Sequence, residues 1–146
     1  MKNLQTTIFE LKATTTPERF SAVNLQLATY NPAYLKRFGT VGSNDWWAHY
    51  EAGCISRTLI CGQITFVGSR QLGTETEDIV SILTDTGTIE YDREDFWCCK
   101  QIRLGVWVTI ERIKTKCLTP NGPLTNFIDV KITCDLEDHD RRIRKA

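Results

Sequence analysis

The sequence predicts an α+β protein rich in β-structure, in which an N-terminal helical segment packs on a small antiparallel sheet. Two observations support this prediction. Residues 1–53 carry three helix-start signals, whereas residues 54–134 carry five runs of β-forming residues separated by turns. Because the runs are joined by short connections and not by helices, we expect a five-stranded barrel or a strongly bent antiparallel sheet.

The length and composition are those of one globular domain. The chain has 146 residues, of which 41% are hydrophobic and 25% charged. A chain of this length can bury a core without disulfides. We expect a single domain made of an α-rich segment over residues 1–53, a barrel-like core over residues 54–134 and a charged tail over residues 135–146.

The first elements are expected before residue 30. Leu4–Thr14 contains apolar residues that suit a first strand. Thr16-Pro17 then supplies an N-cap residue followed by proline at the first helical position, which predicts a helix over Pro17–Ala28. The apolar residues that follow have helical spacing: Phe20, Val23, Leu27 and Tyr30.

Two further helices are predicted from their end signals. Asn31-Pro32 repeats the start signal, and Gly39 supplies the stop. Ser43-Asn44-Asp45 is a third start, with Gly53 as its stop.

The strand region begins with Cys54–Gly68, and Gly62 within it indicates a bulge or bend. We expect Gly68–Asp78 to be a polar loop. A hairpin follows, with strands over Ile79–Thr84 and Thr88–Tyr91 joined by a turn that ends in glycine.

The last two strands show the clearest alternation. Ile102–Leu118 places Val106, Val108 and Ile110 on one face, and Asn126–Cys134 alternates throughout. The order of strand, polar loop, tight hairpin and strand over Gly62–Val108 resembles SH3-like and OB-like barrels. This resemblance implies a closed fold without exposed edges.

Charge is unevenly distributed, although the chain is neutral overall. Residues 73–95 contain eight acids and one base, whereas residues 96–118 contain five bases and one acid. One interpretation is that the acidic and basic strands are neighbours and neutralise each other. The other is a dipolar surface that steers a charged partner.

No motif in the chain specifies a reaction or a metal. The six cysteines lack the paired spacing of structural zinc sites, so we expect reduced thiols, no metal and no cofactor. A nucleophilic Cys98 or Cys99 with His49 as its base is kept as an alternative. The tail 135–146 pairs acids with bases four residues later, which suits a helical turn or a flexible tail.

Aromatic and basic residues gather between residues 30 and 50, and further bases follow in the strands. Such side chains stack on bases and hold phosphates, or anchor protein interfaces, but two adjacent tryptophans can also cover the end of a barrel. The candidate binding residues are Tyr34, Lys36, Arg37, Trp46, Trp47, His49, Tyr50, Arg103, Arg112 and Lys114.

The favoured function is a non-enzymatic binding module whose partner is another protein, self-association included. Nucleic-acid binding by the aromatic-basic patch is the alternative, and a small-ligand or cysteine-dependent enzyme site is a further one. Residues 1–7 lack a basic stretch followed by an apolar one, and no apolar run reaches the length of a membrane span. We therefore expect a cytoplasmic protein without membrane contact.

Overall fold

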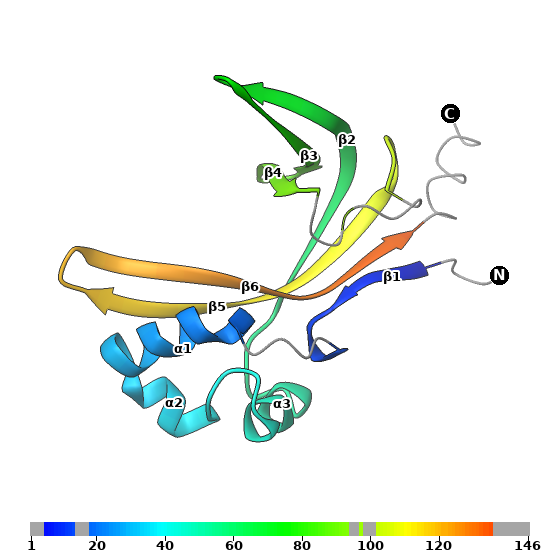
Figure 1. Ribbon diagram of the computed structural model, residues 1–146. Coiled ribbons are helices and arrows are strands. Elements are labelled where there is room, and N and C mark those ends of the chain that lie inside the picture. The colour runs from blue at the N-terminus through cyan, green and yellow to red at the C-terminus, as the bar shows by residue number, and fades with distance from the viewer. Residues whose placement is uncertain (1–4, 14–17, 94–96, 98–101, 136–146) are drawn as a thin grey trace. The chain divides into compact units, whose positions relative to one another are not determined.

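The computed structural model describes residues 5–13, 18–93, 97 and 102–135 (Figure 1). Six strands form one antiparallel sheet in the order β1-β6-β5-β2-β3-β4. The strands are β1 (Gln5–Glu10), β2 (Thr58–Leu72), β3 (Glu75–Thr84), β4 (Gly87–Asp92), β5 (Trp107–Thr119) and β6 (Gly122–Asp135). The helices are α1 (Glu18–Tyr30), α2 (Pro32–Phe38) and α3 (Asn44–Glu51), with a short 3-10 turn, η1, over Leu11–Ala13.

The prediction of a sheet-rich α+β chain with N-terminal helices is confirmed. The sheet formed by the described strands is not a closed barrel, because β1 and β4 are its two edges. It has six strands and not five, because the first run of the chain pairs with β6 through Gln5–Glu10.

The predicted end signals stand at the ends of α2 and α3, but the side chain of Asn31 does not cap α2 and donates instead to the carbonyl oxygen of Lys116 at 2.8 Å. Pro32 opens α2, and Ser43 caps α3 by accepting a hydrogen bond from the backbone N–H of Trp46 at 3.2 Å. Gly39 and Gly53 follow the two helices with φ of +86° and +82°, values that glycine adopts without strain. The Thr16-Pro17 signal of α1 lies outside the described residues, as does the predicted tail helix.

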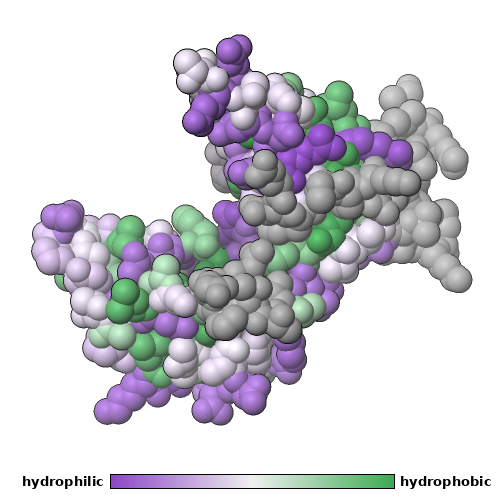
Figure 2. All heavy atoms as spheres, viewed as in Figure 1, coloured by the Kyte–Doolittle hydropathy of each residue, from purple (hydrophilic) through white to green (hydrophobic). Residues whose placement is uncertain are grey.

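The predicted loop over Gly68–Asp78 is wrong. Those residues continue β2 and β3 as a ladder that runs from Gly68 opposite Ile79 to Leu72 opposite Glu75, closed by a turn at Gly73. Both strands are polar here because both faces are wet, and hydrophilic side chains gather at this hairpin tip (Figure 2). Backbone pairing and the Arg70–Glu77 ion pair, with N···O 2.8 Å, hold the segment without a hydrophobic pattern.

The described residues form two compact units. The sheet unit comprises residues 5–10, 59–111 and 131–135, and the helical unit comprises residues 11–58 and 112–130. Strands β5 and β6 contribute residues to both units, so the unit boundaries differ from the three segments predicted along the chain.

The helical unit is built around α1 and the β5–β6 hairpin. Helix α1 runs along this hairpin (Figure 1), where Cys117 Sγ lies 3.8 Å from the carbonyl oxygen of Gln26. The side chain of Asn24 bonds both backbone groups of Val41, at 2.9 and 3.1 Å, which ties α1 to the loop before α3. Leu27 and Trp46 are fully buried.

The core of the sheet unit includes both faces of β3, since Val80 and Ile82 are buried on one face and Ile79 and Ser81 on the other. The alternation predicted for Val106, Val108 and Ile110 is confirmed, because all three are buried, but the strand β5 begins at Trp107 and not at Ile102. Ile64 and Ile82 lie opposite each other on β2 and β3 and are also buried. None of the described helices is long and apolar enough to cross a lipid bilayer.

Candidate binding surfaces

The aromatic cluster predicted as a binding patch lies in the helical unit, and part of it is core. Trp46 is 0% exposed, and its ring stacks on Tyr50 with centroids 5.6 Å apart. The indole N–H of Trp46 donates a hydrogen bond to the hydroxyl of Tyr34 at 3.1 Å. Buried rings that pack on one another are not available for stacking on a ligand.

Burial also changes the acidity of Tyr34. Desolvation raises the pKa of its hydroxyl, and the hydrogen bond from Trp46 offsets part of this rise. The phenol is therefore held in its neutral form, in which it acts as acceptor for the buried indole.

The remaining aromatic members are only partly exposed. Trp47 is half-buried, with its ring edge-on to Trp46 at 4.8 Å. His49 is half-buried beside Phe38 at 5.7 Å, in a T-shaped arrangement. The guanidinium of Arg57 covers the Tyr50 ring at 4.0 Å.

The predicted basic residues are divided between the two units, and the guanidinium of Arg37 lies 5.0 Å from the centroid of the Phe38 ring in the aromatic cluster. Lys36 and Arg37 are exposed at the C-terminal end of α2. Arg112 and Lys114 lie on β5 in the helical unit, whereas Arg103 is exposed in the sheet unit. A binding role for these residues stays a prediction.

The structure bears on only part of the cysteine-dependent alternative, because Cys98 and Cys99 lie outside the described residues. Cys54 and Cys61 are exposed, Cys117 and Cys134 are buried, and no disulfide joins these four. Over the described ranges, no three His, Cys, Asp or Glu side chains gather closely enough to hold a metal ion.

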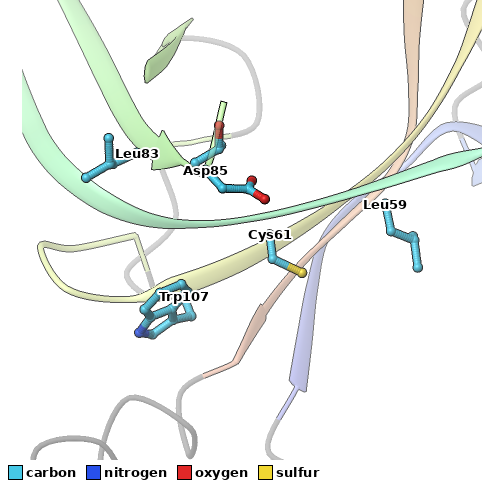
Figure 3. Close-up of a pocket in the computed structure, with 6 residues that line it drawn as sticks. Leu59, Cys61, Leu83, Asp85 and Trp107 are labelled. Atoms are coloured by element: carbon cyan, nitrogen blue, oxygen red, sulfur yellow. The ribbon is translucent and has the colours of Figure 1, made fainter. Parts of the chain in front are cut away.

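A second surface, which the sequence reasoning did not single out, lies on the sheet unit. Leu59 and Cys61 of β2, Leu83 of β3 and Trp107 of β5 surround a pocket of about 520 Å³ (Figure 3). We call these four side chains the sheet face. Asp85, in the turn after β3, also lines this pocket and adds a carboxylate to its edge.

The sheet face lies at the positions that alternate with the core. Cys61 precedes buried Gly62, Leu83 follows buried Ile82, and Trp107 precedes buried Val108. Outward positions of a one-sided antiparallel sheet are normally polar. Here Leu59 is 63% exposed and Leu83 51% exposed, so apolar side chains stand on the solvent side. The sequence did contain a sign of this surface, because β2, β3 and β5 carry apolar residues at both inward and outward positions.

The charges around this face are not neutralised in the way that one interpretation expected. Acidic β3 and β4 do not lie beside basic β5, because β2 separates them in the sheet. Arg70 of β2 instead bridges Glu77 and Glu90, with N···O distances of 2.8 Å to each, and these carboxylates raise the pKa of its guanidinium. Residues 59–93 still hold six acids against two bases.

The helical unit carries a different exposed surface on its β5–β6 hairpin. We call Lys114, Lys116, Leu118 and Phe127 the hairpin face. All four are exposed, whereas Ile113, Thr115 and Cys117 between them are buried. One side of the hairpin is therefore covered and the other carries two bases and two apolar side chains.

The chain matches no known protein-family model, and no curated protein is similar to it in sequence.

Proposed function

We propose that this chain is a binding module for another protein, self-association included, and that the sheet face is its docking surface. One observation carries the proposal: four neighbouring outward positions are occupied by Leu59, Cys61, Leu83 and Trp107 around a pocket. Contiguous exposed apolar patches on a folded domain are typical of interaction sites.

Burial of this face would drive association. Each leucine gains about 1–2 kcal/mol when it is covered, at about 25 cal/mol per Å² of apolar surface. Trp107 is half-buried, and an aromatic ring that is already packed on one side has less side-chain entropy to lose on binding. A partner with an apolar protrusion and a basic group that can reach Asp85 fits this surface.

The test uses three forms of the chain as baits and compares the proteins that each one captures. The baits are the wild type, a double variant that carries both Leu59→Lys and Leu83→Lys, and the control Leu25→Lys. Leu25 is 70% exposed on α1, so its change removes a similar apolar side chain from another place. Proteins lost only with the double variant support the proposal. Identical capture by all three baits, with circular dichroism showing that each is folded, would rule the sheet face out.

Nucleic-acid binding is a second candidate, supported by the hairpin face. The ring of Phe127 is exposed, with the guanidinium of Arg112 5.3 Å from its centroid, and together with the exposed Lys114 and Lys116 it offers stacking and phosphate contacts. Fluorescence anisotropy of a labelled mixed-sequence single strand tests it. Binding that weakens steeply with salt and is lost in Lys114→Glu/Lys116→Glu supports this function, and unchanged anisotropy argues against it.

Three finer predictions stay open to experiment: the likeness to SH3-like or OB-like barrels, the absence of catalysis and the cytoplasmic location. Selective labelling of one thiol at mildly acidic pH would favour a cysteine-dependent enzyme site instead.

A further inference from the structure

The hairpin face of the helical unit has the chemistry that complements the sheet face. Leu118 of β5 and Phe127 of β6 are 74% and 60% exposed, and Lys114 and Lys116 precede Leu118 at alternate positions of β5. Both faces therefore expose apolar side chains, and the sheet face has the carboxylate of Asp85 at its edge where the hairpin face has two ammonium groups.

Within the described residues, the two lysines of the hairpin face remain available for the carboxylates of a partner. Arg112 pairs with Asp129 at 2.8 Å, and both side chains are largely buried, so Asp129 is engaged. Among the described residues, no carboxylate lies in ion-pair range of Lys114 or Lys116. These two ammonium groups are exposed on the strand and can meet an external carboxylate.

The carboxylate at the edge of the sheet face is likewise available for a base of a partner. Arg70 engages Glu77 and Glu90, but Asp85 at the pocket has no base in ion-pair range within the described part of the chain. Asp85 is the acid in the lining of the pocket, whereas Glu75, Glu77 and Asp78 of β3 lie at the other end of the β2–β3 hairpin. Exposed carboxylates and ammonium groups that approach from separate molecules attract each other, and salt screens this attraction.

We propose that the occupant of the sheet face is a second copy of this chain, which docks through its hairpin face. This inference rests on the proposed function and names its partner. The two faces are different patches, so the contact is heterologous: each copy offers one face to the copy before it and the other to the copy after it. Such contacts generate open chains, or rings where the rotation closes.

Complementing variants test this arrangement with the full-length protein. Leu83→Lys disables only the sheet face, and Lys114→Glu/Lys116→Glu disables only the hairpin face. We expect the wild type to grow in mass with concentration in sedimentation velocity, and to lose association when salt is raised from about 50 to 500 mM. Each variant alone should associate at least about tenfold more weakly than the wild type. It should therefore stay monomeric at concentrations at which the wild type associates.

The mixture of the two variants is decisive. Each variant keeps the face that the other lacks, so an equimolar mixture should form dimers and nothing larger. A mixture that stays monomeric while the wild type associates would overturn the head-to-tail contact. Loss of association in Leu83→Lys with none in the lysine variant would show that the sheet face pairs with itself, which also overturns it.

A wild type that is monomeric at every concentration would overturn the second copy as partner. If single-stranded oligonucleotide then binds the wild type and not the lysine variant, the hairpin face belongs to nucleic acid. The proposed function itself is judged separately, because the bait comparison alters only the sheet face and does not require self-association.

Discussion

Tyr34 illustrates how burial sets the chemistry of one side chain in the helical unit. Its hydroxyl accepts the hydrogen bond of a fully buried indole and is itself partly desolvated. The aromatic types of this cluster could be read from the sequence, but their orientation could not. Helix α3 directs Trp46 inward and leaves Trp47 at the edge, and this depends on which side of a short helix meets α2.

The pKa of Tyr34 predicts a pH effect on stability. The folded state raises this pKa above its ordinary value of 10.0, so the folded protein holds the proton more tightly than the unfolded chain does. The contribution to stability is complete below pH 10.0 and is lost as pH rises through the raised pKa. In urea titrations above that pH, Tyr34→Phe should therefore lose less stability than the wild type.

Tyr30→Phe is the control for this measurement, since Tyr30 is exposed at the end of α1. If Tyr34→Phe and the wild type lose stability in parallel at alkaline pH, the hydroxyl of Tyr34 is not desolvated and the account of the cluster is wrong.

The buried indole predicts unequal effects of the two adjacent tryptophans. Trp46→Ala should lower the free energy of unfolding by about 3–5 kcal/mol, because it opens a cavity in the core of the helical unit. Trp47→Ala should cost clearly less, because its ring is half-exposed. Urea denaturation followed by circular dichroism measures both. Equal losses would mean that the two rings are equally buried.

At the scale of elements, β2 shows why local patterns mislead. Gly62 predicts a bulge or a bend. No bulge lies there, because Gly62 pairs regularly with Thr84 and the register shifts further on, between Ile64 and Phe66. The glycine is needed for close approach. A Cβ at Gly62 would lie 2.5 Å from Ile82 Cγ2 and 2.8 Å from the carbonyl oxygen of Leu83.

This crowding predicts that Gly62→Ala destabilises the protein by about 1–3 kcal/mol, because backbone on the neighbouring strand cannot move aside easily. Gly68→Ala is the matched control in the same strand, where the nearest atom to a new Cβ is the Phe66 ring at 3.4 Å, an ordinary contact. A urea midpoint for Gly62→Ala that equals that of Gly68→Ala would show that β3 does not approach β2 so closely.

The helices with local end signals could be predicted from the sequence, whereas the pairing of the strands could not. The starts of α2 and α3 depend on a few adjacent residues, so Pro32 in the first turn of α2 and the capping Ser43 of α3 identify them. The hairpin tip around Gly73 has no apolar pattern, because neither face is buried there. Cross-strand ion pairs such as Arg70–Glu77 become visible only when the register is known.

At the scale of the whole molecule, the class of fold followed from the sequence and the strand order did not. Alternation in β5 and β6 identifies strands, but it does not say that β2 lies between acidic β3 and basic β5. Because of that order, acidic β3 and basic β5 are not neighbours in the sheet. The same limit applies to the sheet face, since exposure of Leu59 and Leu83 depends on which face of the sheet is covered.

The central claim is that the sheet face is a protein-binding surface, with a second copy as its occupant. Cys61 lies in this face and is exposed, and exposed Cys54 in the helical unit is an internal reference. The most direct measurement is the rate of alkylation of each thiol, read by mass spectrometry of peptides as the concentration of purified protein rises. If a second copy covers the sheet face, Cys61 becomes protected while Cys54 reacts at a constant rate. Equal reactivity of the two thiols at every concentration, in samples that sedimentation shows to be associated, would contradict the second copy as occupant.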